Sequence, residues 1–242
     1  MVQVSRRPGP TGRTARASRT GVSGSTLIRL LARLADAGVP ESRQAFADRL
    51  GQWVSWTDAI RLSGALNGGP AATPSGVRGS ASTEEGECTR VRAALVNAIA
   101  EDSAPMDPTA AFSTYRRRYL ARQQAMEAAI GPLRDRLRSR LAAGSPAMAR
   151  LAAVDGVMEQ VLGVQEHRLL STIPVLLEKY FERLRRADEV PDEPDGMVQP
   201  RGWLEVFRND VQGVLLAELD IRFQPVDGLL EALRMSQPGP ND

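Results

Sequence analysis

Residues 108–187 read PTAAFSTYRRRYLARQQAMEAAIGPLRDRLRSRLAAGSPAMARLAAVDGVMEQVLGVQEHRLLSTIPVLLEKYFERLRRA and carry two apolar stripes. The first stripe consists of Tyr119, Gln123, Met126, Ile130, Leu133, Leu137 and Leu141. The second consists of Leu151, Val154, Met158, Val161, Gln165, Leu169, Thr172, Leu176, Tyr180 and Leu184. Both repeat about every 3.67 residues, which fits one face of a nearly straight α-helix better than the 3.5 repeat of a left-handed supercoil. We therefore predict two long helices that turn at Gly144 and Ser145 and pack antiparallel.

Both predicted helices have clear start signals. Asp107 followed by Pro108, and Ser145 followed by Pro146, each place a capping residue before a proline at the first helical position. Gly144 suits the left-handed residue that often ends a helix. At about 1.5 Å rise per residue the two helices would be roughly 54 and 63 Å long, so we expect an elongated molecule.

Composition divides the rest of the chain, which shows no alternating strand pattern. The predicted parts are a disordered basic arm (1–25), a helical hairpin (26–67), a flexible linker (68–86), a helix with the long hairpin (87–187), an acidic linker (188–200), two C-terminal helices separated at Pro225 (201–236) and a tail (237–242). The predicted fold is all-α, an elongated helical bundle built on a long antiparallel helical hairpin.

The sequence offers little for catalysis. His167 is the only histidine and Cys88 the only cysteine, so neither a catalytic triad nor an ordinary metal site can be assembled around several such ligands. No glycine-rich segment matches a phosphate-binding loop. We expect a non-enzymatic protein with no cofactor, no metal and no catalytic residue. A single cysteine and the lack of a long apolar run suggest a cytoplasmic protein without a membrane span.

Charge is strongly segregated along the chain. Residues 116–150 hold nine arginines against two acids, whereas residues 188–242 hold twelve acids against four arginines. The two signs can compensate within the fold, or they can mark surfaces for partners. The candidate partner-binding residues on the first long helix are Arg116, Arg117, Arg118, Arg134 and Arg138. These arginines, with the basic arm, could also hold the phosphates of a nucleic acid without sequence specificity.

Residues 44–62, QAFADRLGQWVSWTDAIRL, partly match a helix-turn-helix motif. Ala47 and Gly51 have the right spacing, but Gln52 stands where the motif needs an apolar residue. Trp53 and Trp56 are three residues apart, as partners on one buried helical face would be. We therefore favour core packing for the two tryptophans over contact with bases.

Two segments, VPESRQAFADRLGQWVSWTDAIRLSGAL and EQVLGVQEHRLLSTIPVLLEKYFERLRR, resemble an uncharacterised family of proteobacterial proteins of about this length, described as a domain of unknown function. The resemblance implies no activity, cofactor or catalytic residue. It does imply a gene neighbourhood with inner-membrane proteins similar to motor-stator subunits and with OmpA-like proteins. An adaptor of a bacterial envelope assembly would fit that setting.

We accordingly expect a helical interaction protein with a protein partner, and the apolar stripes could also support a homodimer. The alternative is a non-specific nucleic-acid-binding protein that uses its arginine-rich arm and the hairpin face.

Overall fold

The computed structural model describes residues 25–36, 46–67, 81–102, 111–189 and 202–236. Every regular element within these ranges is an α-helix, which confirms the all-α prediction. In chain order the helices are α1 (Thr26–Leu34), α2 (Phe46–Trp53), α3 (Trp56–Asn67), α4 (Ala81–Glu101), α5 (Phe112–Ala142), α6 (Pro146–Leu170), α7 (Ile173–Glu189) and α8 (Gly202–Met235).

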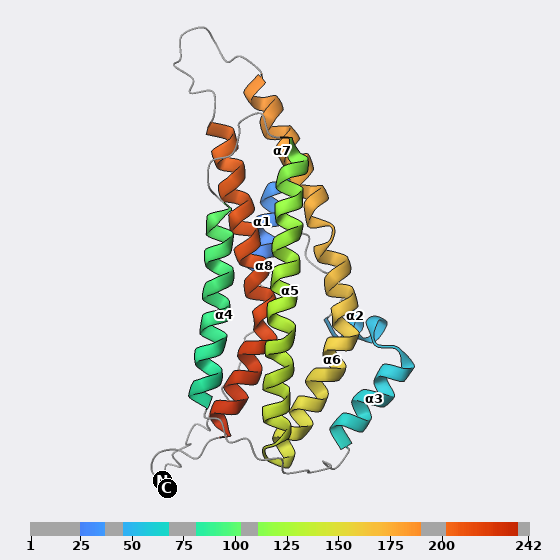
Figure 1. Cartoon of the computed structure of the whole chain (residues 1–242). Coiled ribbons are helices and arrows are strands. Elements are labelled where there is room, and N and C mark those ends of the chain that lie inside the picture. Colours follow the sequence, from blue (N-terminus) through green and yellow to red (C-terminus); the bar gives the residue numbers. More distant parts are fainter. Residues whose placement is uncertain (1–24, 37–45, 68–80, 103–110, 190–201, 237–242) are drawn as a thin grey trace, which may run out of the picture.

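The molecule is an elongated bundle in which α5 and α8 run side by side along the long axis (Figure 1). Helix α4 covers one side of this pair, and the column formed by α6 and α7 covers the other. The two parts of the segment 26–67 pack in different places. Helix α1 contacts α7 and α8. The main contacts of α2 and α3 with other helices are with α6.

The first long helix is α5, which spans about 46 Å at 1.5 Å per residue. It begins at Phe112, and the predicted start at Asp107 and Pro108 lies outside the described residues. Helix α6 begins as expected, because the Ser145 side chain accepts a hydrogen bond from the amide of Met148 and Pro146 follows it. The prediction for Gly144 is wrong, since no described glycine has a positive φ.

The second long helix is divided, which corrects the prediction of one continuous arm through residue 187. Helix α6 ends at Leu170 and α7 begins at Ile173. Pro174 has no N–H for the carbonyl of Leu170, so the regular hydrogen-bond ladder cannot pass this point. The Thr172 hydroxyl instead donates to the carbonyl of Leu169 at 2.7 Å.

Three further boundaries differ from the sequence prediction. Helix α4 begins at Ala81, inside the segment predicted as a flexible linker. Helix α8 continues through Pro225, where a break was predicted. The predicted helical hairpin at 26–67 contains three helices, since its second half is divided between α2 and α3. Ser55 and Asp58 form a capping box at this division: the Asp58 amide donates to Ser55 Oγ and the Ser55 amide donates to Asp58 Oδ2, both at 3.2 Å.

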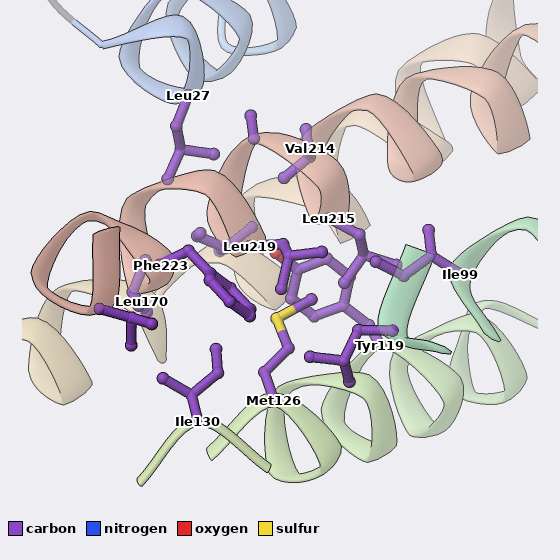
Figure 2. Close-up of a cluster of buried hydrophobic side chains, with 14 of the residues drawn as sticks. Leu27, Ile99, Tyr119, Met126, Ile130, Leu170, Val214, Leu215, Leu219 and Phe223 are labelled. Carbon is purple, nitrogen blue, oxygen red and sulfur yellow. The ribbon is translucent and has the colours of Figure 1, made fainter. Parts of the chain in front are cut away.

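One apolar core runs along the bundle, and all seven residues of the first predicted stripe are buried in α5. Figure 2 shows Tyr119, Met126 and Ile130 of this stripe packed against Leu219 and Phe223 of α8. The extensive contact between α5 and α8 therefore depends on burial of apolar side chains, each contributing about 1.5–3 kcal/mol when fully buried.

The second stripe is largely wrong, since only Val161 and Tyr180 among its ten residues are buried. The buried face lies one residue away from the predicted stripe: Leu170, Ile173, Leu177 and Phe181 are buried, three or four residues apart on both sides of the break. Leu151 and Leu169 of the stripe precede the break and are exposed.

Candidate functional site

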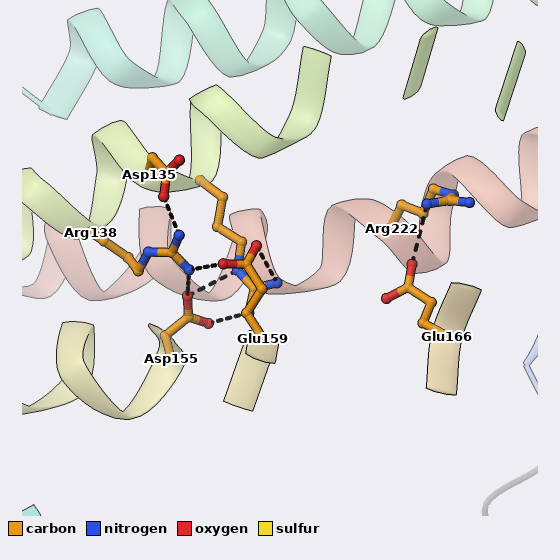
Figure 3. Close-up of polar contacts among 7 residues, drawn as sticks. Asp135, Arg138, Asp155, Glu159, Glu166 and Arg222 are labelled. Atoms are coloured by element: carbon orange, nitrogen blue, oxygen red, sulfur yellow. Dashed lines mark hydrogen bonds and ion pairs between the residues drawn. The ribbon is translucent and has the colours of Figure 1, made fainter. Parts of the chain in front are cut away.

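Two of the five predicted partner-binding arginines are used inside the protein. Arg134 donates to both carboxylate oxygens of Asp155, with Nε–Oδ2 and Nη2–Oδ1 distances of 2.9 and 2.7 Å. Arg138 contacts Asp155, Glu159 and Asp135 (Figure 3). The pairs with Asp155 and Glu159 join α5 to α6, which has only three buried side chains of its own. Arg134 and Arg138 therefore hold α6 in place and are poor candidates for partner binding.

The other three predicted residues lie at the opposite end of α5. Arg116 and Arg117 are exposed and make no ion pair with the described residues. Arg118 is half-buried, and its Nη1 donates to the backbone carbonyl of Asp102 at 3.3 Å. Only this end of α5 keeps basic side chains available to a ligand.

The acids of α8 do not neutralise the arginines of α5. Asp210 pairs with Arg33 of α1, and Asp227 pairs with Arg92 of α4, at 2.5 and 2.6 Å respectively. Helix α8 does pack against the basic helix α5, but through apolar side chains, and no described acid of α8 forms an ion pair with an arginine of α5.

A polar cluster lies inside the bundle where α5 faces α8. Glu218 is fully buried, and its carboxylate accepts hydrogen bonds from Tyr119 Oη at 2.6 Å, Gln123 Nε2 at 3.0 Å and Arg222 Nε at 3.0 Å. Burial and the neighbouring carboxylate both raise the pKa of Tyr119. Because donors surround both oxygens of Glu218, the cluster is satisfied and has a structural role.

The Arg222 side chain connects this cluster to a surface groove between α5 and α6. Its Nη1 lies 3.4 Å from Glu127 and 3.5 Å from Glu166. The groove has a volume of about 330 Å³ and combines an apolar floor, which includes Met126 and Ile130, with a charged rim. Figure 3 shows Arg222 pointing toward Glu166 across this gap.

The rim of the groove carries carboxylates and the histidine of the chain. His167, the only histidine, lies on its rim with an exposed side chain, and its Nδ1 is 3.6 Å from Glu127. No nucleophile is hydrogen-bonded to this histidine among the described residues. Among the described residues, no group of three His, Cys, Asp or Glu side chains lies close enough together to bind a metal ion.

Apolar side chains are exposed on α3. Trp56 and Ile60 are four residues apart on one face of this helix and are 81% and 57% exposed. No residue of α3 is buried, and the helix is attached to α6 by contacts that include a hydrogen bond from Arg61 to Gln160 at 3.3 Å. The prediction that Trp56 belongs to the core is wrong, while Trp53 is half-buried.

Glu218 is not among the predicted site residues, although the sequence contains a signal for its cluster. Gln123 stands in the apolar stripe of α5, four residues after Tyr119, and a buried amide needs a polar partner. The sequence alone does not identify that partner as Glu218, which lies 95 residues later in the chain.

Within the described ranges, no helix is both long enough and apolar enough to cross a bilayer. No curated protein and no solved structure matches the chain. A family model described as "Protein of unknown function (DUF3348)" matches residues 14–235. Since this match covers nearly the whole chain, the protein belongs to the DUF3348 family.

Proposed function

We propose that this protein is a non-enzymatic interaction or adaptor protein that binds a protein partner through the outer face of α3. The observation that carries the proposal is the exposure of Trp56, at 81%, with Ile60 beside it. A large aromatic side chain left in water on a helix surface is a typical anchor for a protein interface. The partner would present an apolar pocket to these two side chains.

The attachment of α3 supports this role. Helices α2 and α3 contribute no described buried side chain, so their outer face does not serve the core of the bundle. The rest of the molecule would act as an elongated support. As part of the same proposal, the protein is cytoplasmic, and the family resemblance makes an envelope assembly the first place to look for the partner.

The test is site-specific photocrosslinking in the native host. A photoreactive amino acid at position 56 should give a discrete adduct with one protein. The same amino acid at Ala94, which is exposed on α4 and away from α6, is the control and should give none. Ile60→Asp should abolish the adduct at position 56. Equal labelling from positions 56 and 94 would refute the proposal.

Nucleic-acid binding is the second candidate, supported by Arg116 and Arg117, which are exposed without ion pairs among the described residues. Arg134 and Arg138 are not part of this basic surface, because they pair with acids of α6. A gel-shift assay with random DNA at low and moderate salt tests this candidate. The shift should be weak, fall steeply with salt and disappear in Arg116→Gln/Arg117→Gln.

A further inference from the structure

The groove between α5 and α6 is large enough to hold a small ligand. Its volume of about 330 Å³ lies at the lower end of the roughly 300–1,000 Å³ that small-molecule sites occupy. Apolar side chains from both helices line it, together with Pro225 of α8; they are Met126, Ile130, Met158 and Leu162. The groove therefore offers an apolar surface to the hydrocarbon part of a ligand.

Two glycines face each other across this groove and keep it open. Gly131 of α5 and Gly163 of α6 both line it, and a Cβ atom added at either residue would meet nothing within 4 Å. Glycine lowers the stability of a helix relative to alanine, so neither glycine is favoured by the helix that contains it. Their small size preserves the space between the two helices.

The ion-pair network in and beside the groove carries an excess of negative charge. Its three guanidinium groups belong to Arg134, Arg138 and Arg222. Its six carboxylates belong to Glu127, Asp135, Asp155, Glu159, Glu166 and Glu218. With His167 neutral, the carboxylates exceed the guanidinium groups by three charges. A cation is the ligand that balances such a network.

The excess carboxylates lie toward the two ends of the groove. Glu159 and Glu166 both line it and are seven residues apart on α6, which places them on one side of the helix and about 10 Å apart along its axis. Figure 3 shows Glu159 beside Arg138, and Glu166 farther along α6 opposite Arg222. A ligand that pairs with both ends must therefore be elongated.

The carboxylates at one end keep acceptor positions for a ligand. Oxygens of Glu127 and Glu166 lie 3.4 and 3.5 Å from Arg222 Nη1, beyond the roughly 2.7–3.2 Å of a normal N–H···O hydrogen bond. The Nε of Arg222 donates to Glu218 at 3.0 Å. The side chains of Glu127 and Glu166 are 45% and 38% exposed, so an ammonium group can reach them from solvent.

We propose that this groove binds a linear aliphatic polyamine. One terminal ammonium group lies at Glu159, the other lies between Glu127 and Glu166, and the methylene groups cover the apolar floor. An ammonium group donates up to three hydrogen bonds, and those to carboxylates are strong. A triamine such as spermidine carries three positive charges, as many as the excess of carboxylates, and its extended chain spans a comparable distance. This inference does not depend on the α3 surface.

The test is isothermal titration of the full-length protein with spermidine at moderate salt. Wild type should bind one molecule. Glu127→Gln and Glu166→Gln should each weaken binding by about tenfold, because each removes a charged acceptor. Glu178→Gln, which changes an exposed acid of α7 that does not line the groove, is the matched control and should bind as wild type does.

A substitution that fills the groove separates this site from a general attraction of cations. Gly163→Leu puts an apolar side chain into the open space without changing any charge, so spermidine binding should fall by about tenfold or more. Its unfolding temperature should be unchanged or higher, because leucine favours a helix more than glycine does. Gly86→Leu, at an exposed glycine of α4 that also has open space, is the matched control. A Gly163→Leu variant that binds spermidine as tightly as wild type would overturn the proposal.

Other cations test the length and the charge of the ligand. Putrescine is shorter and has one charge fewer, so it should bind about tenfold more weakly or worse than spermidine. Three results would also overturn the proposal: no binding of spermidine at millimolar concentration, equally tight binding of Mg²⁺, or binding of a lysine-rich peptide without binding of spermidine. Trp56→Ala should leave these titrations unchanged, so this inference and the proposed function can fail separately.

Discussion

Replacing Glu218 tests whether the buried cluster stabilises the bundle as its geometry indicates. The carboxylate is fully buried and accepts hydrogen bonds from Tyr119, Gln123 and Arg222. Glu218→Gln keeps the shape of the side chain but removes its charge. Hydrogen bonds to a charged group contribute about 1.5–3 kcal/mol, against about 0.5–1.5 kcal/mol for a neutral pair.

The expected cost of Glu218→Gln is about 2–3 kcal/mol in free energy of unfolding. This lies below the roughly 3–5 kcal/mol of a fully orphaned buried charge, because Arg222 Nη1 still lies 3.4 Å from Glu127 and 3.5 Å from Glu166. Glu218→Leu removes every acceptor and should cost about 3–5 kcal/mol. Against a typical total stability of about 5–15 kcal/mol, both effects are large.

Urea unfolding followed by circular dichroism measures these values. Glu231→Gln, which changes an exposed acid of the same helix paired with Arg234, is the matched control and should shift stability by less than about 0.5 kcal/mol. The double variant Glu218→Leu/Arg222→Met should be more stable than Glu218→Leu alone, because in the single variant the Nε of Arg222 loses its acceptor and only the longer contacts of Nη1 with Glu127 and Glu166 remain. Two results would contradict the role of Glu218 as a buried charge partner. One is a Glu218→Gln variant whose free energy of unfolding falls no more than that of Glu231→Gln. The other is a failure of Arg222→Met to restore stability when it is added to Glu218→Leu.

Two other predictions follow from burial and pKa. Phe207→Ala should lower the free energy of unfolding by about 3–5 kcal/mol, because the ring is fully buried, whereas Trp56→Ala should change it by less than about 0.5 kcal/mol in urea unfolding. Burial and a hydrogen bond to Asp210 raise the pKa of Tyr180 to about 12, from 10.0. The fold therefore favours the protonated phenol, so this stabilisation is complete below about pH 10 and is lost as the pH rises toward 12. Ultraviolet titration of phenolate should show native Tyr180 ionising only above pH 10, and ionisation at the pH of free tyrosine would contradict this.

The sequence predicted the first long helix better than the second for a physical reason. The apolar period of α5 is uninterrupted, and Pro132 within it does not end the helix. In the second arm the helix is interrupted between Leu170 and Ile173, and the predicted stripe also lies on the wrong face: Leu169 is exposed while Leu170 is buried. Apolar residues occupy neighbouring positions there, so periodicity alone does not choose the buried face.

The charge pattern of the sequence could not identify which arginines of α5 are available to a partner. The cluster of arginines on α5 was visible in the sequence, but an arginine that binds a ligand cannot be distinguished there from one that pairs with a neighbouring helix. Arg134 and Arg138 face the acids of α6, and Arg116 and Arg117 do not. Only the packing of α6 against α5 separates the two groups. The exposure of Trp56 likewise depends on which face of α3 meets α6.

The interruption between α6 and α7 and the buried Glu218 cluster are connected through one side chain. Pro174 leaves the carbonyl of Leu170 without its helical donor, and Gln123 Nε2 donates to that carbonyl at 3.3 Å. The same amide nitrogen lies 3.0 and 3.1 Å from the two oxygens of Glu218. A leucine at position 123 would fit the apolar period of α5 but would leave the Leu170 carbonyl without this donor and Glu218 with one donor fewer. The glutamine in the stripe is therefore explained by the proline at the start of α7 and the glutamate on α8, and its hydrogen bonds tie α5 to the end of α6 and to α8.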